Sequence, residues 1–389
     1  MHRERNAPRR DGQRIVEEQG MVFGTPARDG TGKDRPYWDE SVHYVLSMSE
    51  VLSVEADVEL LHSMCLEAVE HVVTAERYRD FAIPEWVWPH IAESWRRHDP
   101  YVYGRFDLRY DGSGPAKLLE YNADTPTSLL EAAVLQWHWK TEVYPDDDQW
   151  NSIHERLVER WAQIGDTLPS QELHFTWSSA DPTGEDHVTT AYLQETAAEA
   201  GMDTVGLAIE EIGWDPLLKR FVDLEEAPMN TVVKLYPWEW VVEEEFGRYA
   251  VQSLPKTLWI EPLWKMLLSN KALLAILWEN YPGHPNLLPA FLDQPGPLVE
   301  YVRKPKLGRE GANVQIVAPG YETQTGGVYG AEGYIYQAFH PLPEFDGYRP
   351  ALGAWIVGDE AAGLGIRETA GLVTDDGAAF VPHRIPDAA

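Results

Sequence analysis

The residues of this chain that could do chemistry begin with four polar side chains in the stretch 101–122, YVYGRFDLRYDGSGPAKLLEYN, which predicts two strands joined by a turn. Because successive side chains of a strand point to opposite faces, Arg105 and Asp107 share one face of the first strand. Glu120 and Asn122 share one face of the second strand for the same reason. A hairpin that joins these faces places a guanidinium group, two carboxylates and an amide together.

The turn 111–114, DGSG, sets the expected register of this hairpin. Glycine tolerates the positive φ angles that a tight hairpin turn requires. With the two central residues of the turn at its tip, Arg105 is expected opposite Glu120, and Asp107 diagonal to it. Leu118 is expected on the same face as Glu120, because one residue separates them.

The oxygen atoms of Asp107, Glu120 and Asn122 are ligands that suit Mg²⁺. Bound Mg²⁺ usually keeps some of its waters and bridges to nucleotide phosphates, and an arginine such as Arg105 beside it suits a transferring phosphoryl group. The alternative is a cross-strand salt bridge on a solvated sheet face, which is the ordinary interpretation of an isolated hairpin.

A second informative stretch is 302–311, VRKPKLGREG, in which a strand that carries Lys304 leads into a loop bracketed by glycines. Gly308 and Gly311 let backbone N–H groups approach phosphate oxygens closely, and Arg309 adds positive charge. The stretch is not a Walker A motif, because no GK[ST] follows and no helix is implied. Without other evidence it indicates only a glycine-rich turn.

Four further polar residues lie in apolar surroundings. Lys271 begins a predicted helix, where it is either a nucleotide contact or a surface lysine. Lys234 ends an apolar strand, where snorkelling to the surface is an equally good interpretation. Gln337, in YIYQAF, suits the amino group and ring nitrogens of adenine. Arg367, in GIRET, could clamp a phosphoryl group or pair with a neighbouring acid.

Strands that alternate with helices predict α/β layers for the elements that hold these residues. A chain of 389 residues exceeds one hydrophobic core, so several subdomains are expected. We expect an N-terminal arm over 1–35 and one catalytic unit over 36–389. Within that unit we expect a metal- and substrate-binding part at about 100–225 and nucleotide-binding lobes at about 226–389. Residues 39–78 have helical spacing, and the arm is polar and expected to be loose.

The net charge, the apolar runs and the cysteine content of the chain indicate which partners and which cellular compartment to expect. The formal charge of −31 disfavours nucleic acid and would attract cationic small molecules such as polyamines, although solubility alone also explains it. No apolar run reaches the length of a membrane span, and the start of the chain lacks the apolar stretch of a secretory signal. The single cysteine, Cys65, lies in a helical apolar pattern and is expected to be a buried thiol, which fits a reducing cytoplasm.

Motifs along nearly the whole chain, from about Tyr37 to the C-terminus, resemble the glutathionylspermidine synthetase family. In chain order they are RFDLRYDG, KLLEYNADTPTSLLE, KLYPWEW, SNKALL, KPKLGREGANV, YIYQAF, GIRET and FVPHRIP. The resemblance implies an ATP-grasp fold in the permuted arrangement of glutathione synthetases, with a pre-ATP-grasp-like α/β subdomain. It also implies a carbon–nitrogen ligase that activates a carboxylate with ATP as an acyl phosphate, which an amine then attacks.

The resemblance also implies roles for individual residues, each at the position that matches a family motif. The implied Mg²⁺ ligands are Asp107, Glu120 and Asn122, and the implied arginines beside the acyl phosphate are Arg105 and Arg367. The implied nucleotide contacts are Lys271 and Lys304, with Gln337 at the adenine and Gly308, Arg309 and Gly311 in the lid. The implied substrate contacts are Thr125, Thr127 and Glu185. Threonines stand where the family has serines, with Pro126 between them. Bifunctional members carry an amidase domain, which this chain lacks, so no amidase activity is expected.

The resemblance favours a peptide or amino-acid carboxylate and an amine as substrates, with glutathione and spermidine as the first choice. A catalytically silent, nucleotide-binding relative that recruits partners through an acidic, Trp-rich surface is a second hypothesis. A carbohydrate-active hydrolase, suggested by 16 Trp and many carboxylates, is a third. The ordered lysine, glycine and EYN motifs disfavour the third, and the oligomeric state stays open.

Overall fold

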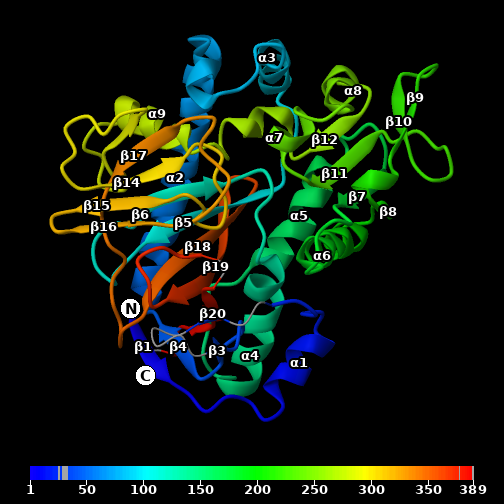
Figure 1. Cartoon of the computed structure of the whole chain (residues 1–389). Coiled ribbons are helices and arrows are strands. Elements are labelled where there is room, and N and C mark those ends of the chain that lie inside the picture. Colours follow the sequence, from blue (N-terminus) through cyan, green and yellow to red (C-terminus); the bar gives the residue numbers. More distant parts are fainter. Residues whose placement is uncertain (25–26, 29–33, 376, 388–389) are drawn as a thin grey trace.

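Strands alternate with helices through most of the chain in a computed structural model that describes residues 1–24, 27–28, 34–375 and 377–387 (Figure 1). The predicted mixture of α and β layers is confirmed, since several sheets are present with helices packed between and around them. No helix among the described residues is long and apolar enough to cross a membrane.

An antiparallel sheet of five strands, which we call the hairpin sheet, contains the predicted hairpin at one edge. Its strands, in spatial order, are β20 (Ala379–Val381), β19 (Glu360–Thr369), β18 (Arg349–Val357), β5 (Tyr103–Arg109) and β6 (Lys117–Asn122). The strands β18 and β19 come from the far end of the chain, so residues some 260 positions apart in sequence share this sheet.

A second antiparallel sheet of five strands, the lid sheet, carries the glycine-rich stretch. Its strands are β13 (Ala290–Leu292), β17 (Tyr334–Ala338), β14 (Tyr301–Pro305), β15 (Gln315–Ala318) and β16 (Tyr321–Gln324). Its middle strands lie next to the hairpin strands β5 and β6 in Figure 1. The glycine-rich loop is the connection between β14 and β15.

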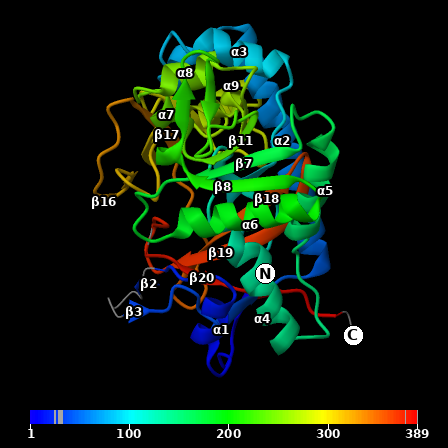
Figure 2. The ribbon, with the colours of Figure 1, turned by 90° about the vertical axis from the view of Figure 1, so that its right-hand side faces the viewer.

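A parallel sheet and several helices form the remaining layers, and Figure 2 shows α6 running alongside this sheet. The sheet has the order β12 (Leu258–Ile260), β11 (Thr231–Leu235), β7 (Glu172–Trp177), β8 (Asp203–Ala208), and a separate hairpin pairs β9 (Gly213–Asp215) with β10 (Arg220–Val222). The later helices are α3 (Trp88–Arg96), α4 (Gln136–Val143), α5 (Ile153–Gly165), α6 (Glu185–Glu199), α7 (Trp238–Val241), α8 (Gly247–Gln252) and α9 (Ala272–Asn280), with a π-helical turn at Glu131–Leu135 and 3₁₀ turns at Arg77–Phe81, Ile209–Glu211 and Leu263–Met266.

The N-terminal residues that the structure describes are folded into the molecule, so the expectation of a loose arm is wrong for them. Strand β1 (His2–Arg5) pairs with β4 (Val42–Val45), which also pairs with β21 (His383–Arg384). Helix α1 (Gly12–Glu18) follows β1, and β2 (Ala27–Arg28) pairs with β3 (Asp34–Arg35). Residues 25–26 and 29–33 of the predicted arm lie outside the described residues.

The predicted helix over 39–78 is shorter at its start, because Val42–Val45 is strand β4 and helix α2 spans Met48–Thr74. Ser47 and Glu50 form a capping box that fixes where α2 begins: the Ser47 side chain accepts the Glu50 N–H, and the Glu50 carboxylate accepts the Ser47 N–H. The strand reads as helical in sequence because all four of its residues are buried.

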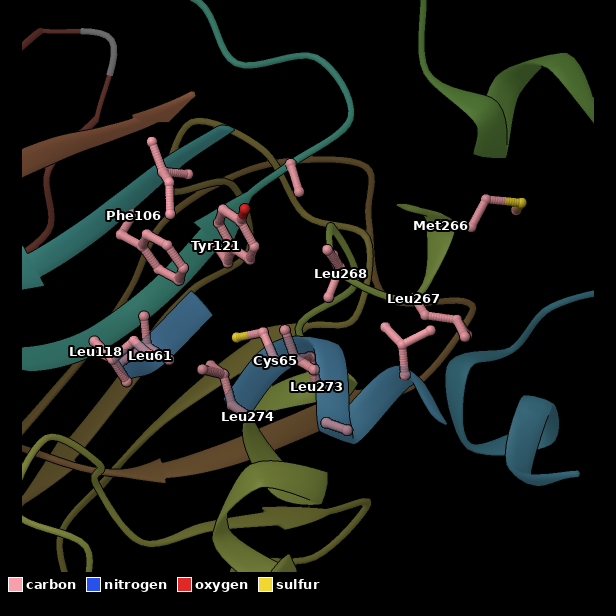
Figure 3. Packing of buried hydrophobic residues seen from close by; sticks show 14 of the residues in the cluster. Leu61, Cys65, Phe106, Leu118, Tyr121, Met266, Leu267, Leu268, Leu273 and Leu274 are labelled. Atoms are coloured by element: carbon pink, nitrogen blue, oxygen red, sulfur yellow. The ribbon is translucent and has the colours of Figure 1, made fainter. Parts of the chain in front are cut away.

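Helix α2 packs under the hairpin, and Figure 3 shows Leu61 and Cys65 on it next to the hairpin side chains Phe106, Leu118 and Tyr121. Phe106 and Tyr121 stack with ring centroids 3.8 Å apart. The predicted burial of Cys65 is confirmed, and burial raises the pKa of its thiol. The apolar side of the hairpin is therefore fixed against a long helix, while its polar side is left for other contacts.

Candidate active site

The predicted register of the hairpin is wrong by two residues of β6 at the site, where Arg105 was expected opposite Glu120. Asp107 lies opposite Glu120, and Arg105 lies opposite Asn122, because the pairing shifts between Asp107 and Leu108 at a β-bulge. Leu119 is the extra residue of this bulge. The shift turns the preceding residue, Leu118, to the core face, contrary to the prediction that it shares a face with Glu120.

Asp107 is the centre of a buried charge cluster made by two arginines. Arg105 Nε donates to Asp107 Oδ1 at 2.8 Å, and Arg367 Nη2 lies 3.5 Å from Asp107 Oδ2. Strand β18 lies between the strands that carry these arginines and contributes Gly353, opposite Asp107. A Cβ on this glycine would lie 3.0 Å from Arg105 Cδ, so the small residue leaves room for the guanidinium group. These three charged residues line one small cavity with Trp355.

Glu120 connects the hairpin to lysine residues that come some 150 to 180 positions later in the chain. Lys271 Nζ lies 3.1 Å from Glu120 Oε2 and donates to Gly308 O at 2.5 Å. Asn122 Nδ2 donates to Glu120 Oε1 at 3.3 Å. Burial would raise the pKa of Glu120, but the positive charges of Lys271 and Lys304 outweigh it and lower that pKa. Glu120 is therefore ionised.

Lys304 and Gln337 reach the two backbone carbonyls at the bulge of β6. Lys304 Nζ donates to Leu119 O at 3.0 Å and to Gln337 Oε1 at 2.8 Å. Gln337 Nε2 donates to Leu118 O at 3.0 Å. Burial, with the nearby charge of Lys271, lowers the pKa of Lys304 to about 8. The amide of Gln337, predicted as an adenine contact, is thus committed here to joining the lid sheet to β6.

Arg309 attaches the glycine-rich loop to the loop after β6 and to α7. Its Nη1 donates to Thr125 Oγ1 at 3.1 Å, and its Nη2 donates to Glu239 Oε1 at 2.8 Å. Gly311 has φ +69°, and a Cβ there would lie 2.8 Å from Val373 Cγ1. Gly308 lies against Pro305, and its carbonyl is the acceptor for Lys271.

The predicted substrate residues lie beside this cluster, on the loop after β6 and at the start of α6. Arg105 Nη1 donates to Thr127 O at 2.6 Å. Glu185 is the first residue of α6. Burial raises the pKa of Glu185, although Thr127 and Arg367 oppose the rise. The structure therefore brings Thr125, Thr127 and Glu185 to the side of the cluster that faces the parallel sheet.

Glu131 is a charged residue of the site that sequence reasoning missed. Its side chain is 1% exposed, on the π-helical turn Glu131–Leu135, and Tyr37 Oη donates to its Oε1 at 2.5 Å. Its Oε2 has no hydrogen-bond partner among the described residues. Burial and the charge of Glu185 raise the pKa of Glu131 to about 7. The signal in the sequence is a single acid inside the apolar run SLLEAAVL.

Of the two interpretations of Lys234, a snorkelling side chain and a functional one, the structure excludes the snorkelling one. Its Nζ is buried 2.5 Å from Asp124 Oδ1, and Asp124 Oδ2 accepts the Trp238 N–H at the start of α7 at 2.8 Å. Asp124 follows the last strand residue of β6 by two positions. This ion pair anchors the loop 123–130 to the parallel sheet.

The chemistry of the donor set fits Mg²⁺ better than a transition metal. The described residues hold no cluster of three or more His, Cys, Asp or Glu side chains of the kind that encloses a metal. They do place two carboxylates, Asp107 and Glu120, on opposite residues of one hairpin with the Asn122 amide beside them. Mg²⁺ is usually bound through one or two carboxylates together with substrate phosphates. The arginine and lysine contacts of these carboxylates supply positive charge where phosphates would lie.

Comparison with known proteins identifies a family over almost the whole chain. Residues 3–386 match the family described as glutathionylspermidine synthase preATP-grasp. A Haemophilus influenzae protein that carries the provisional name acid–amine ligase is 42% identical over 375 residues, which cover 93% of each chain. A trypanothione synthetase of Crithidia fasciculata is 31% identical over 84% of this chain. The bifunctional glutathionylspermidine synthetase/amidase of Escherichia coli is 28% identical over 80% of it.

The chain spans about half the length of these last two relatives, 54% of each. Among solved structures, a glutathione synthetase-like effector from Globodera pallida superposes with a TM-score of 0.60 over 96% of this chain and 95% of its own, at 10% identity. That likeness concerns the fold alone and shows a glutathione synthetase-like arrangement of α and β layers. The class of enzyme predicted from the motifs, an acid–amine ligase, is the one that the name of the Haemophilus relative states. The chain therefore belongs to the glutathionylspermidine synthase preATP-grasp family.

Proposed function

We propose that the chain is an ATP- and Mg²⁺-dependent ligase that joins a carboxylate to an amine through an acyl phosphate. The observation that carries the proposal is the meeting of the early hairpin with the late lysines: Lys271 lies 3.1 Å from Glu120, and Lys304 reaches Leu119 at 3.0 Å. A nucleotide triphosphate held between carboxylates and lysines needs this arrangement. Two regions on opposite sides of the molecule would have excluded it.

Asp107, Glu120 and Asn122 would hold Mg²⁺, which neutralises phosphate charge when a carboxylate attacks the γ-phosphorus. Arg105 and Arg367 flank Asp107 and line the same cavity, so they are placed to orient the carboxylate and the transferred phosphoryl group. The carboxylate oxygen bonds to the γ-phosphorus as the bond to ADP breaks. Lys271 and Lys304 would then hold the nucleotide side of the same group.

In the second step the amine nitrogen bonds to the acyl carbon, inorganic phosphate leaves, and the nitrogen loses a proton. We assign the proton acceptor to Glu131, whose buried Oε2 has no hydrogen-bond partner in the part of the chain that the structure describes, and whose pKa is raised to about 7 by burial and the charge of Glu185. A base with a pKa near the working pH combines a sufficient ionised fraction with a sufficient affinity for the proton. Glu185, beside it, would attract the cationic part of the amine.

The loop 307–313 would exclude water from the acyl phosphate, which hydrolyses when water reaches it. Arg309 holds this loop to Thr125 and Glu239, on the substrate side of the site. Closure of the loop is thereby linked to the residues proposed to hold the carboxylate substrate. This link would favour lid closure only when that substrate is bound.

A glutathione-like peptide and a polyamine are the substrates we propose, because two relatives are named trypanothione synthetase and glutathionylspermidine synthetase. The net charge of −31 favours a cationic amine over an anionic one. The carboxylate is expected to approach the threonine loop and the amine to approach the acidic cluster of Glu131 and Glu185.

The test incubates the protein with Mg-ATP and a panel of peptides and polyamines, and measures ADP, phosphate and the mass of the amide product. Turnover is expected only when a carboxylate and an amine are both present. Replacement of the amine by hydroxylamine should trap the acyl phosphate as a hydroxamate. ATP binding, detected as a shift in unfolding temperature, without turnover on any pair would instead favour the catalytically silent relative.

A further inference from the structure

Glu368 follows the proposed catalytic Arg367 on β19, and its buried carboxylate accepts hydrogen bonds from three side chains. Arg3 donates to it from Nε at 2.9 Å and from Nη2 at 2.8 Å. Arg35 Nη2 donates at 2.6 Å, and Tyr44 Oη donates at 2.8 Å. The side chain of Glu368 is 0% exposed. Two guanidinium groups on one buried carboxylate are a strong, geometrically specific contact.

All three donors come from the N-terminal part of the chain, on strands β1, β3 and β4. The guanidinium groups of Arg3 and Arg35 also lie 4.8 Å from the ring centre of Tyr348, just before β18. The cluster of Arg3, Arg35, Tyr44 and Glu368, which we call the arginine clamp, therefore ties the first strands of the chain to the hairpin sheet.

The clamp acts near the end of β19. Glu368 pairs with Pro350 on β18, and proline has no N–H to donate to the ladder. On the other side, Glu368 pairs with Ala379 at the end of the contact with β20. Adjacent strand residues point to opposite faces, so the clamp holds one face of β19 while Arg367 projects from the other toward Asp107.

A cavity of about 680 Å³ adjoins the clamp, and Arg3, Arg35 and Tyr348 line it. The guanidinium groups are therefore held by their ion pairs more than by dense packing around them. A substitution of Arg3 at the wall of this cavity removes no side chain of the hydrophobic cores, and its unfolding temperature, measured beside its activity, separates the loss of the buried ion pair from the effect on catalysis.

We propose that Glu368, held by Arg3 and Arg35, is a positioning residue for Arg367, so that the N-terminal strands belong to the working ligase site. The inference rests on the proposed function, because it takes Arg367 as the group beside the transferred phosphoryl oxygens. Loss of the clamp lets the end of β19 shift and moves the Arg367 guanidinium away from Asp107.

The test is a double-mutant cycle on ATP-dependent amide formation with Glu368→Gln, Arg367→Ala and the double variant. Glu368→Gln is expected to lower kcat by about 30-fold, within the range for a misplaced catalytic group, and to change KM for ATP less than twofold. The double variant should be no slower than Arg367→Ala alone, because the two residues act as one unit. Independent, multiplying losses would overturn the proposal.

Arg3→Gln should reproduce the loss in kcat, and Arg3→Lys should recover part of it. Arg5→Gln is the matched control, since Arg5 lies on the same strand and is exposed. Crystal structures of the wild type and of Glu368→Gln give a readout that needs no activity. Displacement of Arg367 from Asp107 in the variant supports the clamp, and an unmoved Arg367 overturns it. A wild type without turnover would refute the proposed function and leave this structural result to decide the clamp.

Discussion

The hairpin sheet and the lid sheet each contain five antiparallel strands, and they differ in what covers them. Strands β18 and β19 are buried along nearly their whole length, between helix α2 on one side and α5 with the π-helical turn on the other. Strand β14 has one buried residue and β16 has none. The hairpin sheet carries the acids and arginines of the site, and the lid sheet carries Lys304 and the glycine loop, while Lys271 lies at the start of α9.

This difference separates two physical tasks. Metal ligands and arginines must keep their geometry within a fraction of an ångström, which a packed sheet provides. A cover over a nucleotide must open and close, which requires few buried contacts. The two sheets meet where Lys304 and Gln337 donate to the carbonyls of Leu119 and Leu118. We therefore expect nucleotide binding to change these hydrogen bonds first.

The largest effect should come from a carboxylate of the hairpin sheet. Glu120→Gln should lower kcat about 10³-fold, because it removes a charge that we propose holds Mg²⁺ near the phosphoryl group. Steady-state ATP turnover measures it. Glu322→Gln is the control, since Glu322 is an exposed acid of the lid sheet whose carboxylate accepts only from Gln315 among its described contacts. A loss below tenfold for Glu120→Gln would remove the assigned metal site.

A truncated side chain should cost more folding stability in the hairpin sheet than in the lid sheet, because the side chains of the hairpin sheet are more deeply buried. Leu352, on β18, is 0% exposed, and Leu352→Ala should cost about 3 kcal/mol through lost contacts and a cavity. Tyr321, on β16, is 45% exposed, and Tyr321→Ala should cost less than about 0.5 kcal/mol. Thermal unfolding followed by circular dichroism compares them. Equal shifts in the unfolding temperature would show that the lid sheet is as tightly packed as the hairpin sheet.

A smaller effect is expected in the glycine loop. Gly311→Ala places a methyl group 2.8 Å from Val373 at φ +69°, so it should raise KM for ATP about tenfold by hindering the lid. Gly320→Ala is a matched control, because Gly320 has φ +73° and no atom within 4 Å of an added Cβ. Both variants carry similar backbone strain, so only a difference in KM supports a lid that closes at Gly311.

The smallest effect should be a bell-shaped pH dependence of kcat/KM between about pH 6 and 9. Glu131 must be ionised to accept a proton, so the rate rises as pH passes its pKa of about 7. Lys304 must be protonated to hold phosphate, so the rate falls as pH passes its pKa of about 8. Glu131→Gln should remove the lower limb and keep the upper one. A lower limb unchanged in that variant would contradict the assignment of the proton acceptor.

The sequence predicted the hairpin because its turn chemistry and alternating side chains are local signals. It did not predict the bulge, because LLEYN alternates in the same way whether or not Leu119 is an extra residue. Strand β4 was mistaken for helix because its four residues are all buried and so lack the period of a strand. The motifs identified the family because they occur in the family's order from about Tyr37 to the C-terminus, and the family match spans residues 3–386.

Residues that act across long sequence separations were beyond the reach of local patterns. Glu368 meets Arg3 across 365 positions, and nothing near either residue indicates the other. Glu131 looks like one polar residue of an amphipathic helix until burial is known. The convergence of Lys271 with Glu120 could be inferred only by assigning Glu120 to Mg²⁺ and Lys271 to the nucleotide whose phosphates that ion would bridge.

The bulge at Leu119 makes the contact between the two sheets depend on the number of residues in β6. Loss of the single codon for Leu119 would leave Glu120 opposite Asp107, because Leu118 already lies opposite Leu108, but it would remove the carbonyl that accepts from Lys304 Nζ. Substitutions in the exposed turn would be tolerated far better than any such frame-preserving deletion. Among descendants of this gene, gaps are therefore expected to be rarer between the turn and Asn122 than in the loop 326–333 of the lid sheet.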